Sequence, residues 1–153
     1  MVTLLRPNRI LLTLTPNNRR AVLQKLATHI ALDLGRPLAG LHDILTSPFE
    51  THLTALGRGA VVIDSLAPEL DQPYLLLARL AHPVMFADLD HQPIDLCAVL
   101  FSSDQNRAHH LQSIAWLVRK LQDPHLLAAW RGAGSVDAVR AIFMPDSSTA
   151  RAA

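Results

Sequence analysis

Asp64 is the residue whose type and position suggest chemistry most directly, because it follows an apolar run at 60–63 (Ala-Val-Val-Ile). This run is short and rich in β-branched residues, as is typical of a buried strand. Gly57-Arg58-Gly59 before it predicts a tight turn, since glycine adopts positive φ readily. Catalytic and ligand-binding residues of α/β proteins often lie just past the end of such a strand. The segment therefore predicts a carboxylate presented at the edge of a sheet.

The histidines are the other candidates for chemistry, and the chain has eight of them. His109 and His110 are adjacent, but neighbouring residues on a helix point about 100° apart and are poor joint ligands of one ion. A metal site made of His52, Asp64 and His110 is the alternative, and it needs three separate elements to converge. We predict no metal site and no cofactor. The single cysteine, Cys97, lies among apolar residues and is expected to be a buried small side chain, not a nucleophile.

The elements that must position these residues follow from the hydrophobic pattern. We expect strands over 9–15, 60–63, 74–80 and 94–101, and helices over 18–34, 38–46, 105–122, 124–131 and 136–143. The strand over 94–101 is apolar on both faces after Asp95 and is therefore expected to be central. The predicted buried stripe of the longest C-terminal helix is Leu111, Ile114, Ala115, Val118 and Leu121.

Loops are expected over 66–73 and 82–92. Strands and helices alternate irregularly along the chain, which predicts an α/β fold with helices on both faces of a mixed sheet.

Length, composition and net charge limit the classes of function that this chain can have. The 153 residues suffice for one domain, which we place at 1–144, with the small, polar segment 145–153 as a disordered tail. No apolar run reaches the roughly 18–20 residues that span a membrane, and we see no signal peptide, so membrane insertion is not expected. A net charge of +1 gives no reason to propose a nucleic-acid partner. One cysteine fits the reducing cytoplasm, where we expect the protein to act.

Four segments along the chain share their order with a known family. They are 41–45 (Leu-His-Asp-Ile-Leu), 56–63 (Leu-Gly-Arg-Gly-Ala-Val-Val-Ile), 86–96 (Phe-Ala-Asp-Leu-Asp-His-Gln-Pro-Ile-Asp-Leu) and the pair His110-Leu111. Together they resemble the enzyme IIA domain of the mannitol/fructose class of the bacterial phosphotransferase system, nearest its nitrogen-regulatory branch. The third segment is the most specific, since it is similar to the family signature Phe-x-x-x-Asp-x-x-Pro-Val-Asp-Leu. The resemblance covers roughly 4–143 and implies a mixed five-stranded β-sheet flanked by helices on both faces.

The resemblance also implies where the site lies. In the family the strand after the glycine loop ends in Ile-Pro-His, and this histidine accepts a phosphoryl group from the phosphocarrier. Here Asp64 stands at the aligned position, and the arginine that precedes the loop in the family is not matched. The resemblance assigns Thr54 and the loop Gly57-Arg58-Gly59 to the phosphate site, and His110 to the second histidine of the family.

Three functions follow. The first is a degenerate regulatory protein that accepts no phosphoryl group at the usual position, has no enzymatic activity of its own, and binds a phosphocarrier-like protein or a regulated kinase or transporter. Asp64 then either imitates the charge of a phosphohistidine, with Arg58 or His110 as counter-ion, or is a solvated loop residue left after the activity was lost. The second is an active phosphocarrier that uses His110, His109 or Asp64 as acceptor; the related role of a sugar-transporter component is a third. The sequence does not predict the oligomeric state.

Overall fold

The computed structural model describes residues 5–67, 70–86, 92–103 and 105–144. The elements in chain order are β1 (Arg9–Leu14), α1 (Arg19–Leu34), α2 (Leu38–Thr46), β2 (Thr51–Ala55), β3 (Ala60–Leu66), β4 (Tyr74–Met85), β5 (Pro93–Ser102), α3 (Arg107–Leu121), α4 (Pro124–Gly132) and α5 (Val136–Phe143). Two expectations fall outside these ranges: the disordered tail over 145–153 and the middle of the 86–96 motif. None of the described helices combines the length and the hydropathy needed to cross a membrane.

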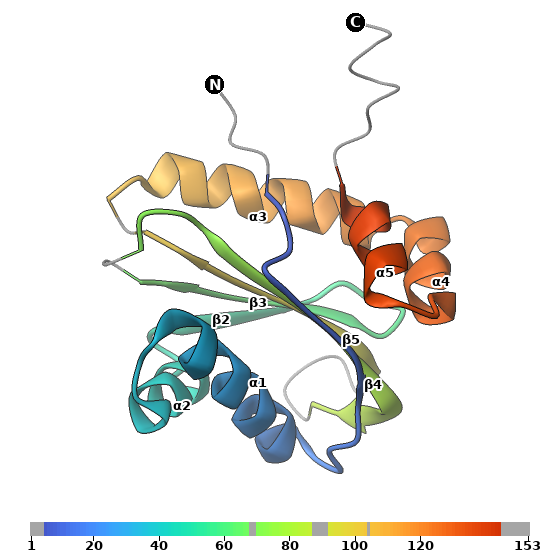
Figure 1. Cartoon of the computed structure of the whole chain (residues 1–153), viewed down its shortest axis with the longest axis horizontal. Coiled ribbons are helices and arrows are strands. Elements are labelled where there is room, and N and C mark those ends of the chain that lie inside the picture. The colour runs from blue at the N-terminus through green and yellow to red at the C-terminus, as the bar shows by residue number, and fades with distance from the viewer. Residues whose placement is uncertain (1–4, 68–69, 87–91, 104, 145–153) are drawn as a thin grey trace, which may run out of the picture.

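The strands form one mixed sheet in the order β1-β4-β5-β3-β2 (Figure 1). β5 runs parallel to β3 and antiparallel to β4, while β1 pairs with β4 in parallel and β2 pairs with β3 in antiparallel orientation. The segment expected to be central is therefore central, because both faces of its apolar run are covered. The predicted fold class, a mixed five-stranded sheet with helices on both faces, is confirmed.

Two helical layers cover the sheet, α1 and α2 on one face and α3, α4 and α5 on the other (Figure 1). Successive side chains of a strand point to opposite faces. Val61 and Ile63 of β3 accordingly pack in the cluster beneath α1 and α2, and Ala60 and Val62 pack in the cluster beneath α3 to α5. Asp64 continues the second series, so its side chain is directed to the α3 side of the sheet.

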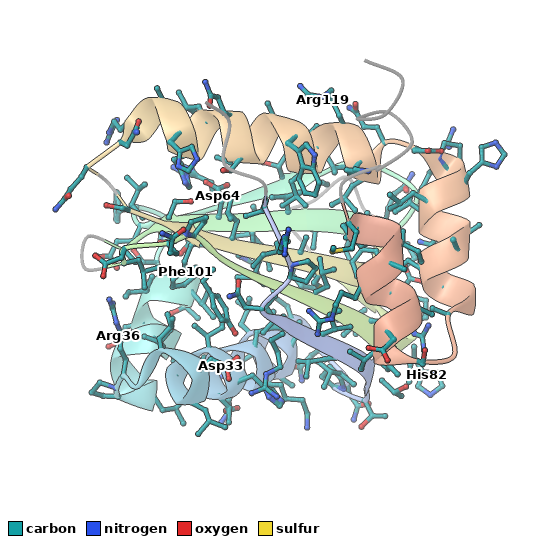
Figure 2. All side chains as sticks on the ribbon, turned by 45° about the horizontal axis from the view of Figure 1, so that its top comes forward. Asp33, Arg36, Asp64, His82, Phe101 and Arg119 are labelled. Carbon is teal, nitrogen blue, oxygen red and sulfur yellow. The ribbon has the colours of Figure 1, made fainter. Side chains whose placement is uncertain are left out.

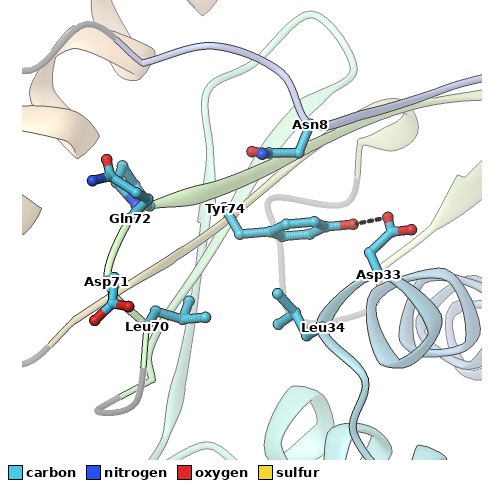
Figure 3. Close-up of a pocket in the computed structure, with 8 residues that line it drawn as sticks. Asn8, Asp33, Leu34, Leu70, Asp71, Gln72 and Tyr74 are labelled. Carbon is cyan, nitrogen blue, oxygen red and sulfur yellow. Dashed lines mark hydrogen bonds between the residues drawn. The ribbon is translucent and has the colours of Figure 1, made fainter.

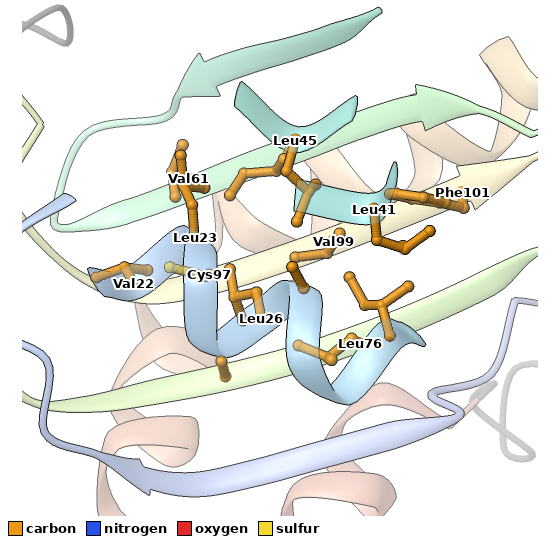
Figure 4. Packing of buried hydrophobic residues seen from close by; sticks show 14 of the residues in the cluster. Val22, Leu23, Leu26, Leu41, Leu45, Val61, Leu76, Cys97, Val99 and Phe101 are labelled. Carbon is orange, nitrogen blue, oxygen red and sulfur yellow. The ribbon is translucent and has the colours of Figure 1, made fainter. Parts of the chain in front are cut away.

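Leucines of α1 and α2 close the first cluster over Val61, Cys97 and Val99 (Figure 4). Cys97 is fully buried there, as expected for a small apolar side chain. Burial raises the pKa of its thiol to about 12, so the thiolate that a nucleophile needs is absent near neutral pH.

The strands β3, β4 and β5 are longer than the hydrophobic pattern predicts. The segment 82–86 was expected in a loop, but β4 continues to Met85, where Val84 and Met85 pair with Ile94 and Pro93. The pairing of β4 with β5 is irregular between Arg79 and Val84, and it resumes after the exposed residues 81–83.

β2 was not predicted from the pattern at all. It is an edge strand whose exposed positions are polar, and the ladder with β3 determines its conformation. β3 itself extends to Leu66, so Asp64 lies inside a strand and not beyond its end.

Arg79 is the one charged residue in the apolar run of β4, and its hydrogen bonds explain its presence there. Its guanidinium donates hydrogen bonds to the carbonyl of Leu12 at 2.8 Å and to the carbonyls of Trp130 and Ala133 at 2.8 and 2.7 Å. The last carbonyls of a helix lack partners within the helix, and here a cation supplies them at the end of α4. Arg79 therefore fixes α4 against β1 and β4.

Candidate functional site

A pocket of about 710 Å³ opens between β2, β3 and the first half of α3. It is lined by Phe49, Glu50, His52, Thr54, Asp64, Ser65, Leu66, Arg107, His110, Leu111 and Ile114. Figure 2 shows Asp64 beneath α3, on the side of the sheet that its place in β3 dictates. The pocket brings together three residues that the sequence assigned to the site: Asp64, His110 and Thr54.

Asp64 and His110 form a buried pair at this pocket. Nε2 of His110 lies 3.3 Å from Oδ2 of Asp64, and the two residues are 7 % and 4 % exposed. His110 is in the first turn of α3, and Asn106 caps that turn by accepting a hydrogen bond from the backbone N–H of His109 at 3.0 Å. The cap therefore fixes the turn that directs the imidazole onto β3. The alternative that Asp64 is a solvated loop residue is wrong.

The buried face of α3 differs from the predicted one. The residues of α3 that are buried are His110, Ser113, Leu117 and Leu121. Leu111 was expected inside but is 63 % exposed, and Ala115 is exposed as well. The other three residues of the predicted stripe, Ile114, Val118 and Leu121, pack against the core. The helix is rotated so that a polar residue points inward at the pocket and an apolar residue points outward. Such an exchange opposes the ordinary hydrophobic pattern, and it is expected where a site is built.

Three imidazole nitrogens of this segment are paired or buried. Nε2 of His110 faces the Asp64 carboxylate, and Nδ1 of His110 is buried with no hydrogen-bond partner among the described residues. Nε2 of His109 is also buried and unpartnered within the same ranges. A phosphoryl acceptor needs a ring nitrogen whose lone pair can reach the donor. Neither nitrogen of His110 meets that condition in this arrangement.

His52 shares the pocket but forms no metal site with the pair. It stands opposite Asp64 in the β2–β3 ladder and is exposed. Across the part of the chain that the structure describes, no group of three or more His, Cys, Asp or Glu residues is placed to hold a metal ion. The ligand set of His52, Asp64 and His110 is therefore not supported.

The glycine loop lies at the other end of β3. Gly57, Arg58 and Gly59 all have positive φ, at 80°, 55° and 84°. None of them lines the pocket, and Ala60, the next residue, is about 13 Å from Asp64 at ~3.3 Å per strand residue. The interpretation of Arg58 as the counter-ion of Asp64 is wrong, because the counterpart of that carboxylate is His110.

What holds the loop is an ion pair that the sequence did not predict. The guanidinium of Arg131 in α4 donates to both carboxylate oxygens of Asp95, at 2.8 and 2.7 Å, and to the carbonyl of Arg58. The hydrogen bonds to Asp95 raise the pKa of Arg131. Asp95 belongs to the 86–96 motif, which was the only sequence signal for this contact. The loop therefore has a demonstrable structural role at this end of the sheet.

A second pocket of about 450 Å³ lies beside Tyr74 (Figure 3). The Tyr74 hydroxyl donates to Oδ2 of Asp33 at 2.6 Å, and Nε of Arg9 donates to the same oxygen at 3.0 Å. The hydrogen bond from Arg9 lowers the pKa of Asp33, while burial raises the pKa of Tyr74. These contacts join β1, α1 and β4, and their partners satisfy one another. The arrangement is structural.

The chain is similar to known proteins over almost its whole length. The model of the family described as "Phosphoenolpyruvate-dependent sugar phosphotransferase system, EIIA 2" matches residues 3–144. The "Nitrogen regulatory protein" of Bradyrhizobium diazoefficiens is 29% identical over 147 residues, which are 96% of this chain and 96% of the relative.

Solved structures share the fold. The nitrogen regulatory protein IIA-Ntr of Neisseria meningitidis has a TM-score of 0.80 at 19% identity, covering 89% of this chain and 93% of its own. A complex of enzyme IIA-Mtl with phosphorylated enzyme IIB-Mtl of Escherichia coli contains a chain with a TM-score of 0.68 at 13% identity, covering 91% and 96%.

Proposed function

We propose that this chain, which belongs to the EIIA 2 family of the phosphoenolpyruvate-dependent sugar phosphotransferase system, is a nitrogen-regulatory protein that transfers no phosphoryl group. It acts in the cytoplasm by binding protein partners. The similarity to two nitrogen regulatory proteins supports the regulatory branch. The complex of a IIA protein with a phosphorylated IIB protein supports a protein as partner, and we expect a phosphocarrier-like protein or a regulated kinase or transporter.

The observation that carries the proposal is the Asp64–His110 pair. The family resemblance aligns Asp64 with the acceptor histidine, and the carboxylate lies 3.3 Å from the histidine that the same resemblance pairs with the acceptor. A carboxylate is negative near neutral pH, as is a phosphohistidine. Asp64 therefore supplies a fixed negative charge where the relatives would acquire a transient one, and partners meet a permanently charged site.

The alternative acceptors are less well supported. His110 would have to break its contact with Asp64 and turn a buried nitrogen outward before it could attack phosphorus. Phosphorylation of Asp64 itself would require a divalent metal and further carboxylates to organise the phosphoryl oxygens. Within the described ranges no such cluster surrounds it. A carrier function at His110 or Asp64 would thus require rearrangement of the site.

The test is a phosphoryl-transfer assay with labelled phosphoenolpyruvate and the two general proteins of the phosphotransferase system. An active IIA protein in the same mixture is the positive control. We expect label on the control and none on this chain. Label on the wild-type chain would refute the proposal, and its disappearance in His110→Ala would assign the acceptor to that imidazole.

Restoring the histidine tests the rest of the site. We expect Asp64→His alone to remain unlabelled, because the arginine that precedes the loop in the family is not matched here and Arg58 lies at the far end of β3. Full recovery would show that the missing acceptor is the only defect.

A further inference from the structure

One oxygen of the buried Asp64 carboxylate has no protein partner. Oδ2 is the atom that contacts His110. Oδ1 receives no hydrogen bond from a described residue, and it is not among the buried atoms that are sealed from solvent. Asp64 lines the pocket, so this free acceptor is open to whatever enters there. A partly desolvated carboxylate with an unused acceptor favours a cationic donor.

Two exposed apolar side chains stand at the mouth of the same pocket. Phe49 is 92 % exposed and Leu111 is 63 % exposed, and both line the pocket. They come from the segment before β2 and from α3, the two elements between which the pocket opens. Large apolar side chains around a buried polar centre are typical of protein-binding surfaces. The outward orientation of Leu111 thus adds an apolar side chain to this surface.

The other charges at the pocket lie at its rim. Glu50, His52 and Arg107 are all exposed, and none forms an ion pair with a described residue. Solvent and salt screen exposed charges strongly. The floor of the pocket is therefore the buried Asp64–His110 pair with its free oxygen Oδ1, while Glu50 adds negative charge and Arg107 opposes it at the entrance.

We propose that a partner protein inserts an arginine or lysine side chain into this pocket, between Phe49 and Leu111, and donates a hydrogen bond to Oδ1 of Asp64. The proposal rests on the function proposed above, since it assigns to the unphosphorylated site a binding preference of its own. The pocket then selects a cation where a phosphoryl-binding site would select an anion. Arginine suits it best, because a guanidinium also stacks on an aromatic ring such as that of Phe49.

The probes are two matched peptides, acetyl-Leu-Arg-Leu-amide and acetyl-Leu-Glu-Leu-amide, and inorganic phosphate. Each is titrated into the uniformly 15N-labelled chain while backbone amide and imidazole resonances are followed by NMR. We expect the arginine peptide to give saturable shifts at Asp64, His110 and Leu111. The glutamate peptide and phosphate should give none there.

Variants separate the carboxylate from the rest of the pocket. Asp64→Asn keeps the shape but removes the charge, and should weaken the arginine peptide roughly fivefold or more, as loss of about one charged contact implies. Asp43→Asn, an exposed change on α2, is the matched control and should have no effect. Arg107→Gln should tighten binding, because it removes the opposing charge at the entrance. The spectra of the free variants report directly whether each is folded.

Three results would overturn the proposal: no saturable shift with the arginine peptide, equal affinity in Asp64→Asn, or saturable binding of phosphate at this pocket. If the chain stays unlabelled in the transfer assay and does not bind the arginine peptide, this inference alone is refuted. If the chain becomes labelled, the proposed function itself is refuted.

Discussion

The Asp64–His110 contact should contribute measurably to stability, and a double-mutant cycle can isolate its share. The variants are Asp64→Ala, His110→Ala and the double change. Each single change leaves the other member buried without its partner. The cycle subtracts the loss of packing that accompanies each truncation, so the remaining coupling energy belongs to the contact.

The expected magnitude follows from burial and geometry. An exposed ion pair contributes at most about 1 kcal/mol, whereas a buried polar group that loses its partner costs about 1–3 kcal/mol. The two side chains are 9 % and 6 % exposed, which favours the larger range, but 3.3 Å is long for a hydrogen bond and favours the smaller. We therefore expect each single change to cost about 1–3 kcal/mol and the coupling energy to be about 1 kcal/mol.

Urea unfolding followed by far-ultraviolet circular dichroism gives the four free energies, and equal m-values among the variants would justify the comparison. Because the pair is buried, high salt should reduce the coupling only slightly. A coupling energy below about 0.3 kcal/mol, the scatter found for independent sites, would refute the reasoning. The pair would then be a coincidence of packing and could not be the centre of the site.

Three further changes test the surrounding structure. Gly59→Ala should lower the free energy of unfolding, measured in urea, by at least about 2 kcal/mol. Gly59 has a φ of 84°, and a Cβ there would lie 2.5 Å from a carboxylate oxygen of Asp95. Gly35→Ala is the control, because Gly35 has positive φ but open space around it, and it should cost only about 1 kcal/mol. Asp33→Asn should cost about 1 kcal/mol at neutral pH. Arg9 holds the pKa of Asp33 below its ordinary value, so this contribution is complete above about pH 4 and disappears as the pH falls through the folded pKa; denaturation of both proteins across pH measures it. Cys97 should resist iodoacetamide in the native chain and react after unfolding in urea, as mass spectrometry would show, because burial raises its pKa to about 12.

The parts of the fold that could be predicted are those that local chemistry specifies. Gly35 ends α1 in the left-handed conformation, as its type predicts. Asp123 caps α4 ahead of Pro124, and Ser135 caps α5, each through its own side chain. The apolar run over 94–101 is the centre of the sheet because no polar face remains to be solvated. In each case the cause lies within a few residues of its effect.

The parts that could not be predicted depend on partners remote in sequence. β2 and the end of β4 are strands because of the ladders they join, not because of their own patterns. The Arg131–Asp95 pair joins residues 36 apart, and only the packed fold shows that it restrains the glycine loop. The assignment of that loop to the same site as Asp64 came from the resemblance. The extended strand β3 separates the two, since each residue adds about 3.3 Å.

The inward histidine and outward leucine in the first turn of α3 link the fold to the proposed function. Periodicity alone places Leu111 inside and gives no preference to His110, yet the structure buries the histidine and exposes the leucine. The inward imidazole is balanced by a carboxylate 46 residues earlier in the chain, a partner that no helical pattern can contain. Because burying a polar group is costly unless it is paired, the two residues constrain each other: replacing Asp64 by an apolar side chain would remove the reason for His110 to point inward. Leu117 and Leu121 would still hold the rest of α3 on the sheet, but its first turn would lose the contact that fixes it on β3, and with it the position of Leu111 at the rim. Recognition by charge and recognition by apolar contact are therefore coupled in this site through the first turn of a single helix.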